Sequence, residues 1–86
     1  MTLSRIHVAV RLFAAPREAL GRDGMTVDLP AGATVGALLD RLAAEHPALA
    51  GYRPYLQVAV NRRVVGAQAI LQDGDEAALL PPVGGG

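Results

Sequence analysis

The stretch "TVGALLDRLAAEHP", residues 34–47, carries the one long helical pattern in the chain. Its apolar residues recur at i, i+3, i+4 and i+7, which gives a helix one apolar side; they are Val35, Leu38, Leu39 and Leu42. Thr34 is placed to cap the start of the helix, and Pro47 is expected to end it at about His46. Gly36 costs helix stability in the first turns, so it indicates close packing there.

Alternating stretches on both sides of this helix predict the strands of a sheet. Residues 6–13 point Ile6, Val8, Val10 and Leu12 to one side, and His7, Ala9, Arg11 and Phe13 to the other. The further strands are expected at residues 25–29, 56–60, 63–65 and 76–80. In the strand at 56–60, the inward side chains are Leu56, Val58 and Val60, and the outward ones are Gln57 and Ala59. Turns are expected at 30–32, 61–62 and 73–75, and a short helical turn followed by a loop at 14–24.

The order of these elements is β, β, α, β, β, β, which predicts an α+β fold. We expect a ubiquitin-like β-grasp roll, in which a mixed sheet of about five strands is covered by one main helix. Residues 1–80 would form this domain, and residues 81–86 would form an extended C-terminal tail ending in Gly-Gly.

The composition excludes several classes of function. Eight acidic and eight basic residues cancel without clustering, so neither a nucleic acid nor a membrane is expected as a partner. All eight basic residues are arginines, and the chain has no lysine. The absence of cysteine excludes disulfides, thiolate–metal sites and cysteine nucleophiles and fits a reducing compartment, so a cytoplasmic location is expected.

The polar side chains do not assemble a recognisable catalytic or metal site. Asp73, Asp75 and Glu76 are interpreted as a polar turn, because a calcium loop needs a longer, spaced set of oxygen ligands. His7 and His46 lie on different elements without metal-ligand spacing, and residues 32–36 lack the Gly-Lys-Ser/Thr of a phosphate loop. We therefore expect no metal, no bound cofactor and no enzyme activity of the chain alone.

An apolar patch is expected on the face of the sheet that points away from the helix. Phe13 and Leu80 face outward on the first and last strands, and one of Val64 and Val65 must also face outward. Single exposed apolar residues are ordinary. If the first and last strands are neighbours, however, these residues form a surface on which a partner protein could dock.

The last six residues, "PPVGGG", have almost no side-chain chemistry. Pro81 stops the last strand, and Pro82 with it favours an extended course away from the domain. After Val83, the residues Gly84, Gly85 and Gly86 have no Cβ and could enter a channel as narrow as a backbone. The one reactive group is the C-terminal carboxylate; the alternative is an inert, disordered terminus.

These motifs resemble those of the MoaD family, the small subunits of molybdopterin synthase. The segments Asp73–Glu76 and Leu80–Gly86 are similar to that family's closing "DGDE…PPVxGG". The family's "FAxxRExxG" is similar to the segment that contains Phe13-Ala14, Arg17-Glu18 and Gly21. The start of the family's helix is similar to residues 32–35, and its central hairpin is similar to residues 60–61. The resemblance covers nearly the whole chain, and the tail is its most specific part.

The resemblance implies a sulfur carrier. The Gly86 carboxylate would be adenylated by a separate MoeB-like enzyme that uses ATP, and it would then be converted to a thiocarboxylate. The tail, Pro81 to Gly86, would insert into a MoaE-like large subunit and donate sulfur to cyclic pyranopterin monophosphate, with catalytic side chains supplied by the partner. Phe13, Val64 and Leu80 match the family's hydrophobic contact surface.

Some residues depart from the family pattern and leave alternatives open. Leu79-Leu80 replaces a frequent aromatic pair, Pro16 is expected to shorten the helix after Phe13, and the additional Gly84 is common in ThiS, the sulfur carrier of thiamine biosynthesis. The alternatives are a ThiS-like carrier for thiamine thiazole, a ubiquitin-like protein modifier, and an interaction domain with an inert tail. Because it lacks lysine, a modifier of this sequence could not build lysine-linked polymers of itself.

Overall fold

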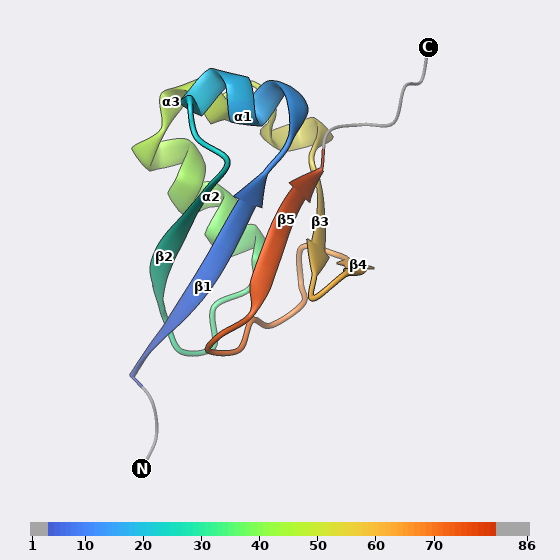
Figure 1. Ribbon diagram of the computed structural model, residues 1–86. Helices are drawn as coiled ribbons and strands as arrows, with labels where there is room; N and C mark the ends of the chain where they lie inside the picture. The colour runs from blue at the N-terminus through green and yellow to red at the C-terminus, as the bar shows by residue number, and fades with distance from the viewer. Residues whose placement is uncertain (1–3, 81–86) are drawn as a thin grey trace.

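The computed structural model describes residues 4–80, which form one five-stranded sheet covered on one face by helices (Figure 1). The strands are β1 (Arg5–Leu12), β2 (Gly24–Pro30), β3 (Gln57–Val60), β4 (Arg63–Val65) and β5 (Glu76–Leu80). The helices are α1 (Ala14–Leu20), α2 (Val35–Glu45), α3 (Pro47–Ala50) and the 3-10 helix η1 (Arg53–Tyr55). Within the described residues, no helix is long and apolar enough to cross a membrane.

The strand order is β2-β1-β5-β3-β4, so the first and last strands are neighbours at the centre of the sheet. β1 and β5 run parallel, with Leu12 opposite Leu79. The other neighbouring strands pair antiparallel. This mixed sheet under one main helix is the α+β roll that the sequence predicts.

The core lies between the sheet and α2. The inward residues of β1 alternate strictly with exposed ones, as the period of a half-buried strand requires; they are Ile6, Val8, Val10 and Leu12. The predicted stripe of α2 is buried against them, and Ala77 and Leu79 of β5 are fully buried between the neighbouring strands. Leu49 of α3 and Leu71 of the loop before β5 complete this cluster.

The start of α2 is held by its cap and by the loop at 66–71. The Thr34 hydroxyl accepts a hydrogen bond from the Ala37 N–H at 3.2 Å. The carbonyl of Ala67 accepts from the Gly36 N–H at 2.8 Å, and a Cβ on Gly36 would lie 3.3 Å from that oxygen. Gly36 is therefore found at a close approach of loop and helix, as its position in the sequence indicates.

Removal of the α2 cap gives a direct test of this local structure. We expect Thr34→Ala to lower the free energy of unfolding by about 1 kcal/mol, because the Ala37 N–H loses its acceptor. Thr34→Ser keeps the hydroxyl and should remain close to wild type. Urea unfolding of the three proteins checks this, and equal losses for Ala and Ser would show that the Thr34 methyl group matters instead.

Helical structure extends further than the sequence pattern predicts. α2 ends before His46 as expected, but Pro47 then begins α3, and Arg53 begins η1, where the sequence pattern predicts no helix. Proline favours the first turn of a helix because its fixed φ suits the helix and no N–H is needed there. Helices of three or four residues are too short to show a periodic pattern in the sequence.

Pro16 lies in the first turn of α1, where a proline is tolerated. It is the third residue of this seven-residue helix and is buried. In the first turn the N–H groups have no intrahelical acceptor, so a proline removes no helical hydrogen bond. Gly21 ends the helix with φ 68° and donates to the Arg17 carbonyl at 2.9 Å, a left-handed position that favours glycine.

Candidate functional site

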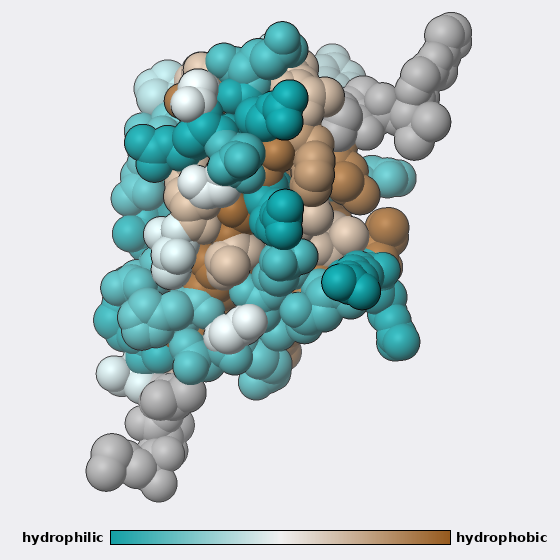
Figure 2. Space-filling model, in the orientation of Figure 1, coloured by the Kyte–Doolittle hydropathy of each residue, from teal (hydrophilic) through white to brown (hydrophobic). Residues whose placement is uncertain are grey.

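The parallel pairing of β1 with β5 assembles an apolar surface on the face of the sheet opposite α2. We call Phe13, Ala59, Val64, Ala78 and Leu80 the outer patch. Across four adjacent strands, Arg11 lies beside Ala78, Ala78 beside Ala59, and Ala59 beside Val64. Figure 2 shows the resulting apolar surface over β5 and β3, bordered by hydrophilic residues.

Phe13 and Leu80 stand next to one another at the end of the sheet. Leu12 is opposite Leu79 in the parallel register, and both side chains point into the core. The residues that follow them, Phe13 and Leu80, therefore point to the outer face. Leu80 also pairs with Gln57 of β3. β5 ends at Leu80, so the outer patch lies directly before the tail in the sequence.

Exposure differs among the residues of the outer patch. Val64 is 60% exposed and Phe13 is 39% exposed, whereas Leu80 and Ala78 are half-buried. Val64 is the outward one of the two valines, and Val65 packs against the core. The structure thus places the three sequence-predicted contact residues, Phe13, Val64 and Leu80, on one face of the sheet, with Val64 on β4, two strands away from Leu80. Their role in binding a partner stays a prediction.

Ala59 corrects one detail of the sequence interpretation. It lies on the outer face as expected, yet it is only 8% exposed. Its small side chain lies between Ala78 on one neighbouring strand and Val64 on the other. Alternation gives the direction of a side chain in a strand, but the size of its neighbours decides its exposure.

Phe13 is held at the point where β1 turns into α1. It lies one residue beyond the strand, not inside it as the pattern of residues 6–13 predicts, and it is the N-cap residue of α1. The next residue, Ala14, has a φ of 52°, a left-handed conformation that is uncommon for alanine. The Arg11 guanidinium lies 5.9 Å from the centre of the Phe13 ring, and its Nη1 is 3.7 Å from Glu76 Oε2. This contact to Arg11 is one that the sequence interpretation missed, although strand alternation already places both residues on one face.

The predicted reactive part of the chain lies outside the described residues. These positions are Pro81, Pro82, Val83, Gly84, Gly85 and Gly86. The tail-insertion and carboxylate roles assigned to them therefore stay predictions.

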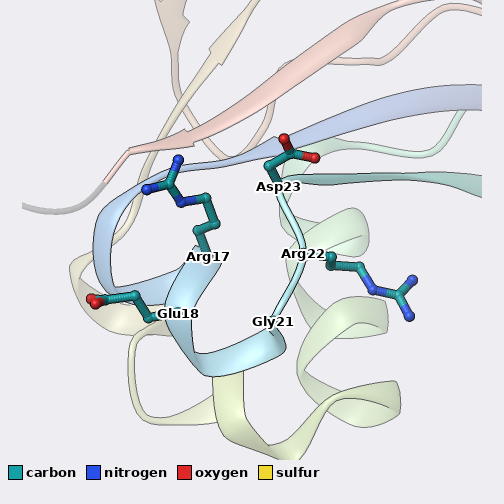
Figure 3. Close-up of a pocket in the computed structure, with 5 residues that line it drawn as sticks. All are labelled: Arg17, Glu18, Gly21, Arg22 and Asp23. Atoms are coloured by element: carbon teal, nitrogen blue, oxygen red, sulfur yellow. The ribbon is translucent and has the colours of Figure 1, made fainter.

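An open hollow of about 480 Å³ lies between the end of α1 and the start of β2 (Figure 3). It is lined by Arg17, Glu18, Gly21, Arg22 and Asp23. In Figure 3 the side chains of Arg17 and Arg22 extend to opposite sides of the connecting loop, so their guanidinium groups do not converge on one ligand. Of the residues that resemble the family motif here, Gly21 supports the turn from α1 to β2 through its left-handed φ and its hydrogen bond to the Arg17 carbonyl.

The acidic residues before β5 stabilise a turn, as the sequence indicates. Asp75 accepts hydrogen bonds from the Gln72 N–H at 2.7 Å and from the Asn61 side-chain amide at 2.9 Å. Asp73 Oδ1 accepts from the His7 N–H at 2.8 Å and lies 3.4 Å from His7 Nδ1. In the part of the chain from residue 4 to residue 80, no three His, Cys, Asp or Glu side chains are placed to hold a metal ion.

Asp73 should make stability depend on pH in acid. The hydrogen bond from the His7 N–H, followed by the contact with the His7 side chain, lowers the pKa of Asp73 below its ordinary value of 3.8. A carboxyl group with a lowered folded-state pKa stabilises the protein above its unfolded-state pKa, and this contribution is lost as the pH falls through the folded-state value.

We therefore expect Asp73→Asn to be less stable than wild type at neutral pH, with a difference that shrinks below about pH 4. Urea unfolding of both proteins across this range measures the difference. A difference that stays the same at every pH would show that ionisation of Asp73 contributes nothing.

Known proteins resemble this chain over almost its full length. The ThiS family matches residues 10–86. The molybdopterin synthase sulfur carrier subunit of Arabidopsis thaliana is 36% identical, over 96% of this chain and 86% of that protein. The corresponding subunit of Mycobacterium tuberculosis is 38% identical, over 94% of this chain and 99% of that protein. Among solved structures, the small archaeal modifier protein 1 of Haloferax volcanii is 33% identical with a TM-score of 0.80, over 91% of this chain and 99% of that chain.

These similarities agree with the ubiquitin-like α+β fold that the sequence predicts. The match begins within β1 and continues to Gly86, so it includes both the folded domain and the tail. The chain therefore belongs to the ThiS family.

Proposed function

We propose that this protein is the sulfur carrier subunit of a molybdopterin synthase. Its Gly86 carboxylate is adenylated, is converted to a thiocarboxylate and donates sulfur to cyclic pyranopterin monophosphate. The observation that carries this proposal is the position of the outer patch. Parallel pairing places Phe13 and Leu80 together at the end of β5, one residue before the Pro-Pro-Val-Gly-Gly-Gly tail begins.

Activation is needed because a carboxylate is a poor electrophile. A carboxylate oxygen of Gly86 attacks the α-phosphorus of ATP, and pyrophosphate leaves. Hydrosulfide (HS⁻), supplied by the sulfur donor, then attacks the carbonyl carbon, a C–S bond forms, the C–O bond to AMP breaks so that AMP leaves, and loss of the S–H proton to water gives the thiocarboxylate. We assign ATP to a MoeB-like activating enzyme, with no cofactor held by this chain.

The large subunit would supply the catalytic groups for the transfer to the pterin. Within residues 4–80, the hydrogen bonds and ion pairs of the acidic residues and of His7 hold turns and strands together. The outer patch instead presents apolar area across β5, β3 and β4, with charged groups such as Arg11 and Glu76 beside it. A surface with an apolar centre and a polar rim is typical of protein interfaces, and we propose that a MoaE-like subunit covers it.

Mass spectrometry tests the carrier function directly. The purified protein is incubated with a MoeB-like enzyme, ATP and a sulfur donor, and the C-terminal peptide is compared before and after. We expect the mass gain of one oxygen replaced by one sulfur at Gly86. No gain in a mixture that sulfurates an established carrier would refute the proposal. Binding to a MoaE-like subunit rather than to a thiazole synthase would then separate the molybdopterin pathway from that of thiamine.

A protein modifier is the second candidate, because of the similarity to the small archaeal modifier proteins of Haloferax volcanii. Small archaeal modifier protein 3 of that organism is 35% identical over 94% of this chain. A modifier would form amide bonds between Gly86 and lysines of other proteins, which appear as branched peptides after digestion of cell extracts. The cytoplasmic location expected from the sequence stays a prediction under both candidates.

A further inference from the structure

The Arg11 side chain connects the Phe13 ring to β5 on the outer face of the sheet. Its guanidinium carbon lies 5.9 Å from the centre of the ring, within the roughly 6 Å over which a cation and an aromatic face attract each other. Arg11 Nη1 lies 3.7 Å from Glu76 Oε2 on β5. One guanidinium group therefore contacts both the aromatic residue of the outer patch and an acidic residue beside that patch.

The register of the strands gives the Arg11 side chain room for these contacts. Arg11 is opposite Gly24 of β2 and Ala78 of β5, and neither neighbour has a side chain that extends beyond Cβ. Glu76 is opposite Ala9, two residues before Arg11 on the same face. The guanidinium can therefore lie along the outer face and reach the carboxylate without displacing a larger side chain.

Phe13 combines a well-defined backbone with an exposed ring. It is the N-cap residue of α1, with φ −135° and ψ 154°, and Ala14 after it has a φ of 52°. The ring is 39% exposed and lies outside the buried cluster. A backbone conformation leaves more than one χ1 rotamer open to an exposed side chain. The contact with Arg11 therefore restrains a ring that core packing does not hold.

Glu76 gives Arg11 a partner whose backbone is fixed. The Glu76 N–H donates to Asn61 Oδ1 at 3.0 Å, and the Glu76 carbonyl accepts from the Asn61 N–H at 2.8 Å. The side chains of Arg11 and Glu76 are each about half exposed, and an exposed ion pair contributes little to the stability of a fold. The main consequence of the contact is therefore expected at the surface that it orders.

We propose that Arg11 is a positioning residue for docking: it holds the Phe13 ring in the orientation that the large subunit contacts, and Glu76 in turn holds Arg11. This inference rests on the proposed function, in which a MoaE-like subunit covers the outer patch. The attraction between a cation and an aromatic ring strengthens when water is excluded from it. Glu76 keeps the Arg11 charge paired as the surface is covered, and a ring that is already ordered loses less freedom on binding.

The orientation of the ring can be measured in the free protein, because Phe13 is the one phenylalanine of the chain. Isotope labelling of phenylalanine alone gives the three-bond couplings that report its χ1 angle by NMR. We expect one dominant rotamer in wild type and averaged couplings in Arg11→Met, which keeps a long side chain without the charge. The matched control is Arg5→Met, which removes the same charge from the same face of β1 and should leave the couplings unchanged.

Titration calorimetry with a MoaE-like subunit measures the effect on docking. At high ionic strength, which screens long-range effects of net charge, we expect Arg11→Met and Glu76→Gln each to weaken binding roughly three- to tenfold. Arg11→Lys should lose less, because it keeps the charge but not the planar group that stacks on a ring. Arg5→Met should bind like wild type. Circular dichroism confirms that each variant is folded.

A double-mutant cycle separates positioning of the ring from a direct contact of Arg11 with the partner. Phe13→Leu keeps an apolar side chain without the ring, so Arg11→Met should cost less than about twofold in that background. The same loss with and without the ring, or unchanged couplings in Arg11→Met, would overturn the proposal. If the large subunit does not bind wild type, the proposed function fails, whereas the NMR comparison still decides whether Arg11 orients Phe13.

Discussion

One residue added after Gly86 is expected to abolish thiocarboxylate formation and leave the folded domain unchanged. Activation requires the carboxylate on the glycine that enters the activating enzyme, and an added side chain both moves that carboxylate and widens a chain end that has no Cβ. The last described strand, β5, ends at Leu80, six residues before Gly86. We therefore expect a loss of sulfuration to the background level with an unchanged unfolding midpoint.

Mass spectrometry of the extended protein, with the activating enzyme, ATP and a sulfur donor, measures this loss. The same residue added before Met1 is the matched control and should keep full sulfuration. If the extended protein still supports dithiolene formation with the large subunit, the carboxylate of Gly86 is not the carrier group.

Leu79 and Leu80 give the second large effect, because adjacent residues of β5 face opposite sides of the sheet. Leu79 is fully buried between Leu12 and Val58, whereas Leu80 is half-buried beside Phe13 and Gln57. We expect Leu79→Ala to lower the free energy of unfolding by about 2–5 kcal/mol, through lost burial and the cavity left behind. That is a large share of the roughly 5–15 kcal/mol that stabilises a typical domain.

Leu80→Ala should have the opposite profile. It removes apolar area from the outer patch and leaves the core intact, so we expect stability close to wild type and an affinity for the large subunit lowered on the order of tenfold or more. Urea unfolding and titration calorimetry of both variants give the comparison. A strongly destabilised Leu80→Ala with unchanged affinity would place Leu80 in the core and remove the outer patch as the docking surface.

Much of the domain follows from local patterns in the sequence. The stripe of α2, its Thr34 cap and the alternation of β1 each depend on neighbours within one or two turns or a few strand positions, and the structure has all three. The turn at Asn61-Arg62 was also recognisable, and both residues have positive φ, as a tight hairpin turn requires. The short helices α3 and η1 were missed because they contain less than one full pattern of apolar positions.

The sequence by itself determined the alternation of β1 and the apolar stripe of α2, because periodicity is a property of the chain, but it left open which of Val64 and Val65 faces outward. Only the tertiary structure decided that Phe13 and Leu80 are neighbours. They are separated by most of the sequence, and they meet because β5 inserts between β1 and β3 and pairs parallel to β1. The tertiary structure also decided how exposed the outward side chains are. Ala59 and Val64 lie side by side on the outer face, but Ala59 is buried between two neighbouring strands, whereas Val64 lies on the edge strand and is exposed.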